Sequence, residues 1–115
     1  DIGLRNSIIG FRQADIAKIL ENIVYLHLLI HGYQVTIGNL GNLEIDFVAE
    51  RFSEKHYIQV TYIMSSRETY DREAGNLLRI NDNFPKYIVS MDELPASNAN
   101  GILHMNIREF LLEFK

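Results

Sequence analysis

The sequence predicts a mixed α/β domain, with helices flanking a central sheet of about five strands, three antiparallel and then a parallel crossover. Residues 43–50 and 56–62 alternate apolar and polar side chains, which is typical of the two arms of an antiparallel hairpin. Before the hairpin, apolar residues recur at helical spacing between residues 16 and 30. After it, helical and extended patterns alternate, which favours a strand reached through a helix.

Composition narrows the class of protein. At 115 residues the chain is expected to form a single domain spanning residues 1–115. The absence of cysteine excludes disulfides and thiolate metal sites, and no apolar run is long enough to span a membrane, so a cytoplasmic protein is expected. A net charge of −4 argues against binding nucleic acid by bulk electrostatics. Because the chain starts at Asp1 and ends in a helical pattern, we expect a piece of a longer protein.

The first helix is expected to follow Asp15 as its N-cap and to end before Gly32, a natural residue after a helix C-terminus. Its apolar arc covers more than half of the circumference, which predicts burial against the sheet. Glu21 lies just past the edge of that arc, where its carboxylate can reach a neighbouring strand as easily as solvent. A strand over residues 33–37 and a turn over residues 38–42 are expected next.

The hairpin arms have a definite expected register. One face of the first arm carries Leu43, Ile45, Phe47 and Ala49, and the other carries Glu44, Asp46, Val48 and Glu50. A loop over residues 51–54, centred on Phe52 and Ser53, places residues whose numbers sum to 105 opposite one another. In this register Asp46 faces Gln59 and Glu44 faces Thr61.

The second half of the chain reads as a helix, two strands and a closing helix. Ser65 and Glu68 have the spacing of a capping box that opens a helix over about residues 66–80. A strand over residues 86–91 should run parallel to the second hairpin arm, because a helix connects the two. Residues 93–101 are expected to form a loop, residues 102–105 a short strand, and Asn106 the cap of the last helix.

Glu21, Asp46, Gln59 and Thr61 are the candidate site, with Asp46, Gln59 and Glu21 as metal ligands. Oxygen ligands of this kind suit Mg²⁺ or Mn²⁺, which bind through one or two carboxylates together with water and substrate phosphate. Such an ion could activate water for phosphodiester cleavage. The ordinary alternative is that these side chains form the solvated face of a half-buried sheet and that Glu21 extends to solvent.

The order of elements and acids resembles the restriction-endonuclease-like PD-(D/E)XK superfamily. More narrowly, the segments over residues 18–26, 32–35, 44–49, 57–62 and 86–92 resemble the DUF4143 domain, the C-terminal part of bacterial and archaeal AAA-type ATPases. The resemblance implies a restriction-endonuclease-like core, a partner ATPase domain in the same parent chain, and ATP bound only in that missing N-terminal part. It also implies that Glu21 matches the acid of the first helix, Asp46 the metal ligand of the second strand, and Gln59 the acid position of the third.

The chain departs from the superfamily at two of these positions. Thr61 stands where active members carry lysine, and Gln59 offers an amide in place of a carboxylate, although Glu44 could replace the missing charge. The sequence therefore favours a catalytically degenerate module that binds nucleic acid or a protein partner. The alternative is a weak or unusual Mg²⁺-dependent nuclease that cleaves DNA or RNA. The oligomeric state is open.

Three fainter patterns do not change this prediction. His27 and His31 have a spacing able to hold zinc, but they point along the apolar face without a third ligand and are expected to pack in the core. Arg67, Arg72 and Arg79 could contact phosphate, but the acids between them favour a solvated helix face. No spacing suggests a Ser-His-acid triad.

Overall fold

The computed structural model describes residues 13–40, 43–63, 67–93 and 97–115. Within these residues three helices and six strands follow one another in the order α2 (Gln13–Ile30), β1 (Gln34–Leu40), β2 (Leu43–Arg51), β3 (Glu54–Val60), α3 (Arg67–Leu78), β4 (Lys86–Ser90), β5 (Ser97–Ala99), β6 (Ile102–Asn106) and α4 (Ile107–Glu113). None of the described helices combines the length and the apolar character needed to cross a bilayer.

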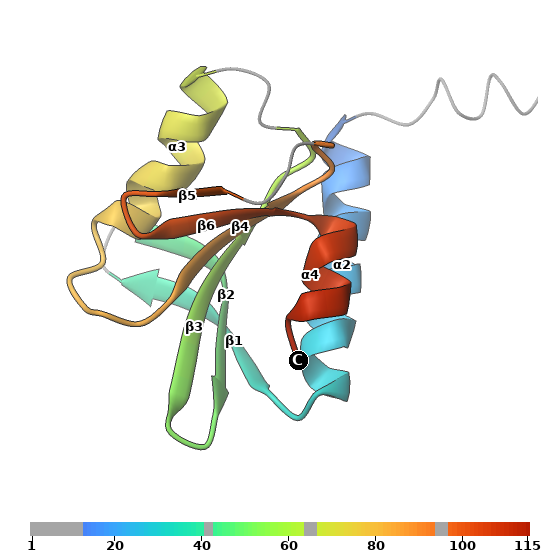
Figure 1. Ribbon diagram of the computed structural model, residues 1–115, viewed down its shortest axis with the longest axis vertical. Coiled ribbons are helices and arrows are strands. Elements are labelled where there is room, and N and C mark those ends of the chain that lie inside the picture. Colours follow the sequence, from blue (N-terminus) through green and yellow to red (C-terminus); the bar gives the residue numbers. More distant parts are fainter. Residues whose placement is uncertain (1–12, 41–42, 64–66, 94–96) are drawn as a thin grey trace, which may run out of the picture.

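The strands form one mixed sheet in the order β1-β2-β3-β4-β6-β5. The first three are antiparallel, β4 is parallel to β3, β6 is parallel to β4, and β5 is antiparallel to β6 at the edge. Helices α2 and α4 cover one face of the sheet and α3 covers the other (Figure 1). The α/β class and the parallel crossover through α3 are therefore confirmed, with six strands in place of about five.

Two apolar cores fill the spaces between the layers. The core beneath α2 and α4 includes Val24, Leu28, Phe47, Ile58 and Phe110. The core beneath α3 includes Ile45, Val48, Leu77, Ile88 and Ile102. Since β2 contributes side chains to both cores, it is buried on both faces, as a strand inside a three-layer α/β domain must be.

Helix α2 differs from its prediction at its start and on its outer surface. It already includes Gln13, so Asp15 lies in the first turn and is not the N-cap. The helix is buried against the sheet, as predicted, but only along one stripe. The large apolar side chains outside this stripe are exposed, namely Ile19, Ile23, Leu26, Leu29 and Ile30. The outer apolar surface of α2 is therefore left uncovered by the described residues.

The C-terminus of α2 ends as predicted at Gly32, which adopts a φ of 85°. Its N–H donates to the carbonyl of Leu29, and the N–H of Tyr33 donates to that of Leu28, both at 3.0 Å. This pair of hydrogen bonds is the Schellman arrangement, in which a left-handed residue closes the helix, and glycine adopts that conformation at least cost.

The register of the β2–β3 hairpin is confirmed. Five cross-strand pairs, from Phe47 with Ile58 to Arg51 with Glu54, follow the sum of 105. The turn is tighter than the expected loop, because Arg51 and Glu54 belong to the strands and only Phe52 and Ser53 connect them. Phe52 takes a φ of 56°, a conformation that a two-residue hairpin turn demands and that a bulky residue adopts only under strain.

The expected alternation along β2 is wrong at Asp46. Thr36 pairs with Val48 but Gly38 pairs with Ile45, so Asp46 and Phe47 together lie opposite the single residue Ile37 of β1. This is a β-bulge, which moves the residues before it to the other face. Ile45 consequently packs with Val48 beneath α3, and it does not share a face with Phe47.

Several other boundaries differ from the expected ones. Residues 38–40, expected in a turn, extend β1 up to the two residues that the structure does not describe. Ser97–Ala99, expected in a loop, pairs with β6 as strand β5. Asn106 caps α4 as predicted, within a capping box completed by Glu109. The capping box expected at Ser65 lies outside the described residues.

Candidate functional site

A cleft of about 350 Å³, open to solvent, lies between α2, α3 and the segment that leaves β3. We call it the acidic cleft. Its described lining comprises Ala17, Glu21, Asp46, Val60, Thr61, Tyr62, Ile63, Thr69, Arg72 and Glu73. Three of the four predicted site residues, Glu21, Asp46 and Thr61, therefore share one cleft, while Gln59 and Glu44 do not line it.

Asp46 is positioned by the bulge of β2. Asp46 is one of the two residues of the bulge, and its half-buried carboxylate accepts a hydrogen bond at Oδ2 from the N–H of Val60 at 2.8 Å. Burial raises the pKa of Asp46 to about 6, and the nearby charges of Glu21, Glu73 and Glu44 act in the same direction. The hydrogen bond from Val60 opposes this shift. The Asp46 carboxylate is thus able to exchange a proton close to neutral pH.

Gln59 is buried, with 4% of its surface exposed, and its amide is used by the backbone of β2. Its Oε1 accepts a hydrogen bond of 2.7 Å from the N–H of Asp46, and its Nε2 donates to the carbonyl of Glu44 at 3.4 Å. Gln59 and Asp46 are adjacent, as the register predicts, but they meet through the backbone of Asp46. The side chain of Gln59 thus substitutes for hydrogen bonds of the strand ladder that the bulge interrupts.

Thr61 lies in the acidic cleft but outside β3, and its N–H donates to the carbonyl of Val89. The last described pair between β2 and β3 is Phe47 with Ile58, so the predicted pairing of Glu44 with Thr61 does not form. None of the four lysines, all of which the structure describes, lines the cleft. Among the described residues that line the cleft, the positive charge is that of the Arg72 guanidinium.

Sequence reasoning missed Glu73. This half-buried acid on α3 lines the acidic cleft, and Arg72 beside it is 70% exposed, with Nε 3.6 Å from Oε2 of Glu73. Burial raises the pKa of Glu73, the charge of Glu21 acts in the same direction, and Arg72 opposes the shift. Thr69, Arg72 and Glu73 have the i, i+3, i+4 spacing of one helix face, but the sequence does not show which strand that face meets.

The donor set fits a divalent metal ion poorly. Glu21, Asp46 and Glu73 line one cleft, but no three acidic or histidine side chains in the described part of the chain converge closely enough to hold a metal ion. Gln59, an expected ligand, has its amide engaged by the backbone. Mg²⁺ and Mn²⁺ bind through one or two carboxylates together with water or phosphate, but the carboxylates must reach the same ion. For that reason we derive no metal-dependent step from this arrangement.

Comparison with known proteins identifies one informative relative. The chain is 36% identical over 113 residues to an uncharacterized protein of Haemophilus influenzae. The match covers 98% of this chain and 28% of the relative. The chain thus spans less than a third of the length of the protein that it resembles. No protein-family profile matches the chain.

The structure also brings together a serine, a histidine and an acid, which the sequence analysis did not expect. Ser90 Oγ lies 2.8 Å from His104 Nε2 and donates to Asp92 Oδ2 at 2.9 Å. In a hydrolytic triad the acid holds the opposite ring nitrogen of the histidine, but here Oδ2 of Asp92 lies 3.7 Å from the same Nε2. Ser90 is also fully buried, so this cluster is not arranged for nucleophilic attack.

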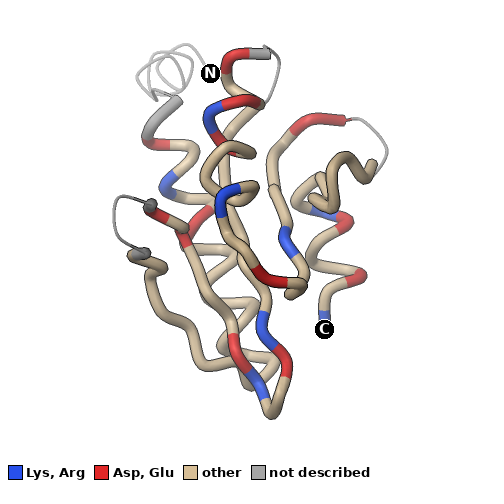
Figure 2. The backbone as a smooth tube through the Cα atoms, turned by 90° about the vertical axis from the view of Figure 1, so that its left-hand side faces the viewer, with Lys and Arg blue, Asp and Glu red and all other residues tan. Residues whose placement is uncertain are grey.

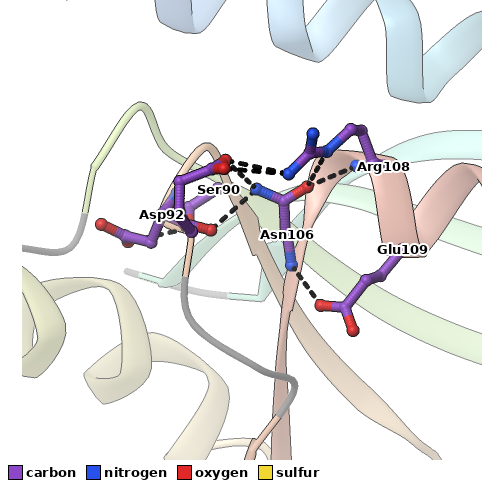
Figure 3. Close-up of polar contacts among 6 residues, drawn as sticks. Ser90, Asp92, Asn106, Arg108 and Glu109 are labelled. Atoms are coloured by element: carbon purple, nitrogen blue, oxygen red, sulfur yellow. Dashed lines mark hydrogen bonds and ion pairs between the residues drawn. The ribbon is translucent and has the colours of Figure 1, made fainter.

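A polar network anchors the segment after β4 to the start of α4. Asn106 donates to the carbonyl of Asp92 at 2.7 Å and accepts from the N–H of Arg108, whose guanidinium pairs with Glu93 at 2.9 and 3.1 Å. Figure 3 shows these side chains gathered around Asn106. The network provides hydrogen-bond partners for the N-terminus of α4 and for the loop after β4 at the same time. Its role is therefore structural.

His27 and His31 likewise serve the structure. Their ring centroids lie 4.4 Å apart, and His27 Nε2 contacts the carbonyl oxygen of Phe114 at 2.6 Å. The rings are half-buried between α2 and the end of α4, with no third metal ligand among the described residues. Both rings are half-buried, so the prediction that they pack in the core is confirmed only in part.

In the part of the chain that the structure describes, basic residues do not gather into one continuous stretch. Acidic and basic residues are interspersed there, and both signs meet at the tip of the β2–β3 hairpin (Figure 2). Of the three arginines considered for phosphate contact, Arg72 pairs with Glu73 and Arg79 is exposed, while the side chain of Arg67 lies outside the described part.

Proposed function

We propose that this chain is a nuclease-like recognition module of a longer protein and that its catalytic centre is degenerate. In this proposal the fold is a restriction-endonuclease-like PD-(D/E)XK core. Support comes from the order of α2, three antiparallel strands, α3 and the parallel strand β4, and from an acidic cleft that joins Glu21 to Asp46. The chain covers only 28% of the Haemophilus influenzae relative, and this supports a module within a longer chain.

The observation that carries the proposal is the bonding of Gln59. Phosphodiester hydrolysis of this type needs carboxylates that hold a metal ion and a cation that polarises the attacking water. At the third-strand acid position this chain has an amide that satisfies the backbone of Asp46 and Glu44. At the lysine position it has the uncharged Thr61. Two of the groups that the reaction requires are therefore missing from the cleft.

The charge of the acidic cleft favours a protein partner over nucleic acid. The described lining carries three acids, Glu21, Asp46 and Glu73, against one guanidinium, that of Arg72, so phosphate groups would be repelled unless a metal ion intervened. The partner that the DUF4143 resemblance implies is an AAA-type ATPase domain of the same parent chain, with ATP bound there and a cytoplasmic setting. We include this partner in the proposal.

A second candidate, a Mg²⁺- or Mn²⁺-dependent nuclease, is favoured by Glu73. This acid could supply the carboxylate that Gln59 does not, because it lines the same cleft as Glu21 and Asp46. The change required is a side-chain movement that brings the three carboxylates together, and a divalent ion could drive it by offsetting their mutual repulsion.

Metal titration of the 115-residue chain tests both candidates. We expect Mg²⁺ and Mn²⁺ to cause no saturable chemical-shift change at the cleft and no cleavage of single-stranded or double-stranded DNA or RNA. Cleavage that saturates with metal and is lost in Asp46→Ala would overturn the degenerate assignment and establish the nuclease. The matched control is Glu50→Ala, which removes an exposed acid from the same strand, outside the cleft.

Binding to nucleic acid is measured separately. Fluorescence anisotropy with labelled oligonucleotides, without metal, should show no salt-dependent binding at micromolar protein concentration. Binding that weakens in Arg72→Ala and disappears with added salt would contradict the choice of a protein partner.

A further inference from the structure

The outer surface of α2 carries an apolar stripe that the described residues leave exposed. Ile19, Ile23, Leu26 and Ile30 are exposed by 48%, 37%, 56% and 78% of their surfaces. They lie on the side of the helix away from its buried residues Leu20, Val24 and Leu28. We call these four residues the α2 seam.

The seam has the spacing of a helix that packs against another helix. Its members are separated by four, three and four residues, which is the heptad pattern of alternating a and d positions. Ile23 and Ile30 would occupy a positions and Ile19 and Leu26 d positions. No charged residue lies between residues 22 and 30, so nothing in the second half of the helix opposes an apolar contact.

We propose that the α2 seam is the interface of a symmetric antiparallel dimer of this chain. The spacing of four, three and four residues is the same in both directions along the helix. In an antiparallel pair centred between residues 24 and 25, Ile19 therefore meets Ile30 of the second copy and Ile23 meets Leu26. A two-fold axis requires the same patch to fit itself, and this register satisfies the requirement with an apolar residue in every position. The antiparallel direction also places the positive end of each helix dipole beside the negative end of the other.

The exposed area indicates a dimer of modest stability. With Leu29 at its border, the seam exposes on the order of 500 Å² per copy, at the upper end of the apolar patches found on monomers and below the roughly 800 Å² per partner of a standard interface. We therefore expect association that depends on protein concentration in the micromolar range.

Sedimentation velocity of the 115-residue chain over a concentration series tests the proposal. We expect the average mass of the sedimenting species to rise with concentration from that of one copy to that of two. The variant Leu26→Glu should remain monomeric at every concentration. Leu112→Glu is the matched control, since Leu112 is an exposed leucine of α4, 68% exposed and outside the seam. Circular dichroism of each variant confirms folding, and exposed positions are chosen so that the substitutions do not disturb the core.

Disulfide trapping tests the direction of the two helices. The chain contains no cysteine, so Ile19→Cys and Ile30→Cys can be introduced singly and mixed in equal amounts. The mixed pair should cross-link at least fivefold more than either variant alone, because like positions are about 16 Å apart in the antiparallel register. A monomer at all concentrations, or preferred cross-linking of Ile19→Cys to itself, would overturn the proposal.

Discussion

The backbone N–H of Asp46 donates a hydrogen bond of 2.7 Å to the side chain of Gln59, at the point where the β2–β3 ladder ends. The last pair of this ladder is Phe47 with Ile58, and beyond it the side chain of Gln59 binds the backbone of β2 at the N–H of Asp46 and the carbonyl of Glu44. In the proposed function this amide replaces an acid of the catalytic centre, and it can both donate and accept.

The first prediction concerns this bridge. Gln59→Leu preserves most of the buried volume but leaves the N–H of Asp46 without its partner, while the carbonyl of Glu44 keeps the hydrogen bond that it accepts from Asn76 Nδ2 at 3.1 Å. Because a buried polar group without a hydrogen bond is costly, we expect the free energy of unfolding to fall by about 2 kcal/mol in urea denaturation. The control is Gln34→Leu, an exposed position on β1, where a change below about 0.5 kcal/mol is expected. Equal losses in the two variants would show that the bridge contributes no stability.

The second prediction concerns the proton of Asp46. Its pKa of about 6 in the folded protein lies above the ordinary value of 3.8, so between pH 4 and pH 6 the folded state holds a proton that the unfolded state has released. Stability therefore falls as pH rises through this window. Asp46→Asn removes the charge but keeps an oxygen for the N–H of Val60. It should stabilise the protein by about 2 to 3 kcal/mol at pH 7.5 and by almost nothing below pH 4.

Urea denaturation of the wild type and Asp46→Asn at pH 4, 5, 6 and 7.5 measures this difference. Glu50→Gln, on the exposed part of the same strand, should give a difference that hardly changes over the range. If Asp46→Asn destabilises the protein equally at every pH, the carboxylate is a structural acceptor and its burial carries no cost. A gain in stability on loss of the acid would instead be the pattern of a residue kept for function.

The third prediction concerns Gly38. A Cβ at this position would lie 2.8 Å from Cβ of Ile45 and 2.9 Å from Cγ2 of Val48, so Gly38→Ala must displace β1 from the bulge. We expect a loss of about 2 kcal/mol in unfolding free energy and a shifted amide resonance of Asp46. Gly75→Ala is the matched control, because Gly75 lies in α3 with open space around its Cβ position, and alanine should stabilise the helix by about 0.5 to 1 kcal/mol.

The fourth prediction concerns Ser90, Asp92 and His104. Because the serine is buried and the acid lies on the same side of the imidazole as the serine, a fluorophosphonate probe should not label the protein. Ser90→Ala should leave ester hydrolysis at the background rate and lower the unfolding free energy by about 1 to 2 kcal/mol. Labelling that is lost in Ser90→Ala would establish a nucleophile at this site and contradict the structural assignment.

Much of the fold could be predicted because the relevant signals are local. The helix that ends at Gly32, the hairpin centred on Phe52 and Ser53, the parallel crossover and the cap at Asn106 each depend on residues that are close in sequence. Strand β5 was missed because its three residues are all exposed and carry no apolar alternation. A short edge strand of this kind depends on its neighbour more than on its own pattern.

From the sequence alone Glu21, Asp46 and Thr61 were predicted to share one site, and the three residues do line one cleft. Only the tertiary structure decided which other residues contact them. The bulge opposite Ile37 depends on how β1 pairs with β2, and the place of Glu73 depends on which face of α3 meets the sheet. Periodicity records which side of a segment is apolar, but contacts between distant segments decide what that side touches.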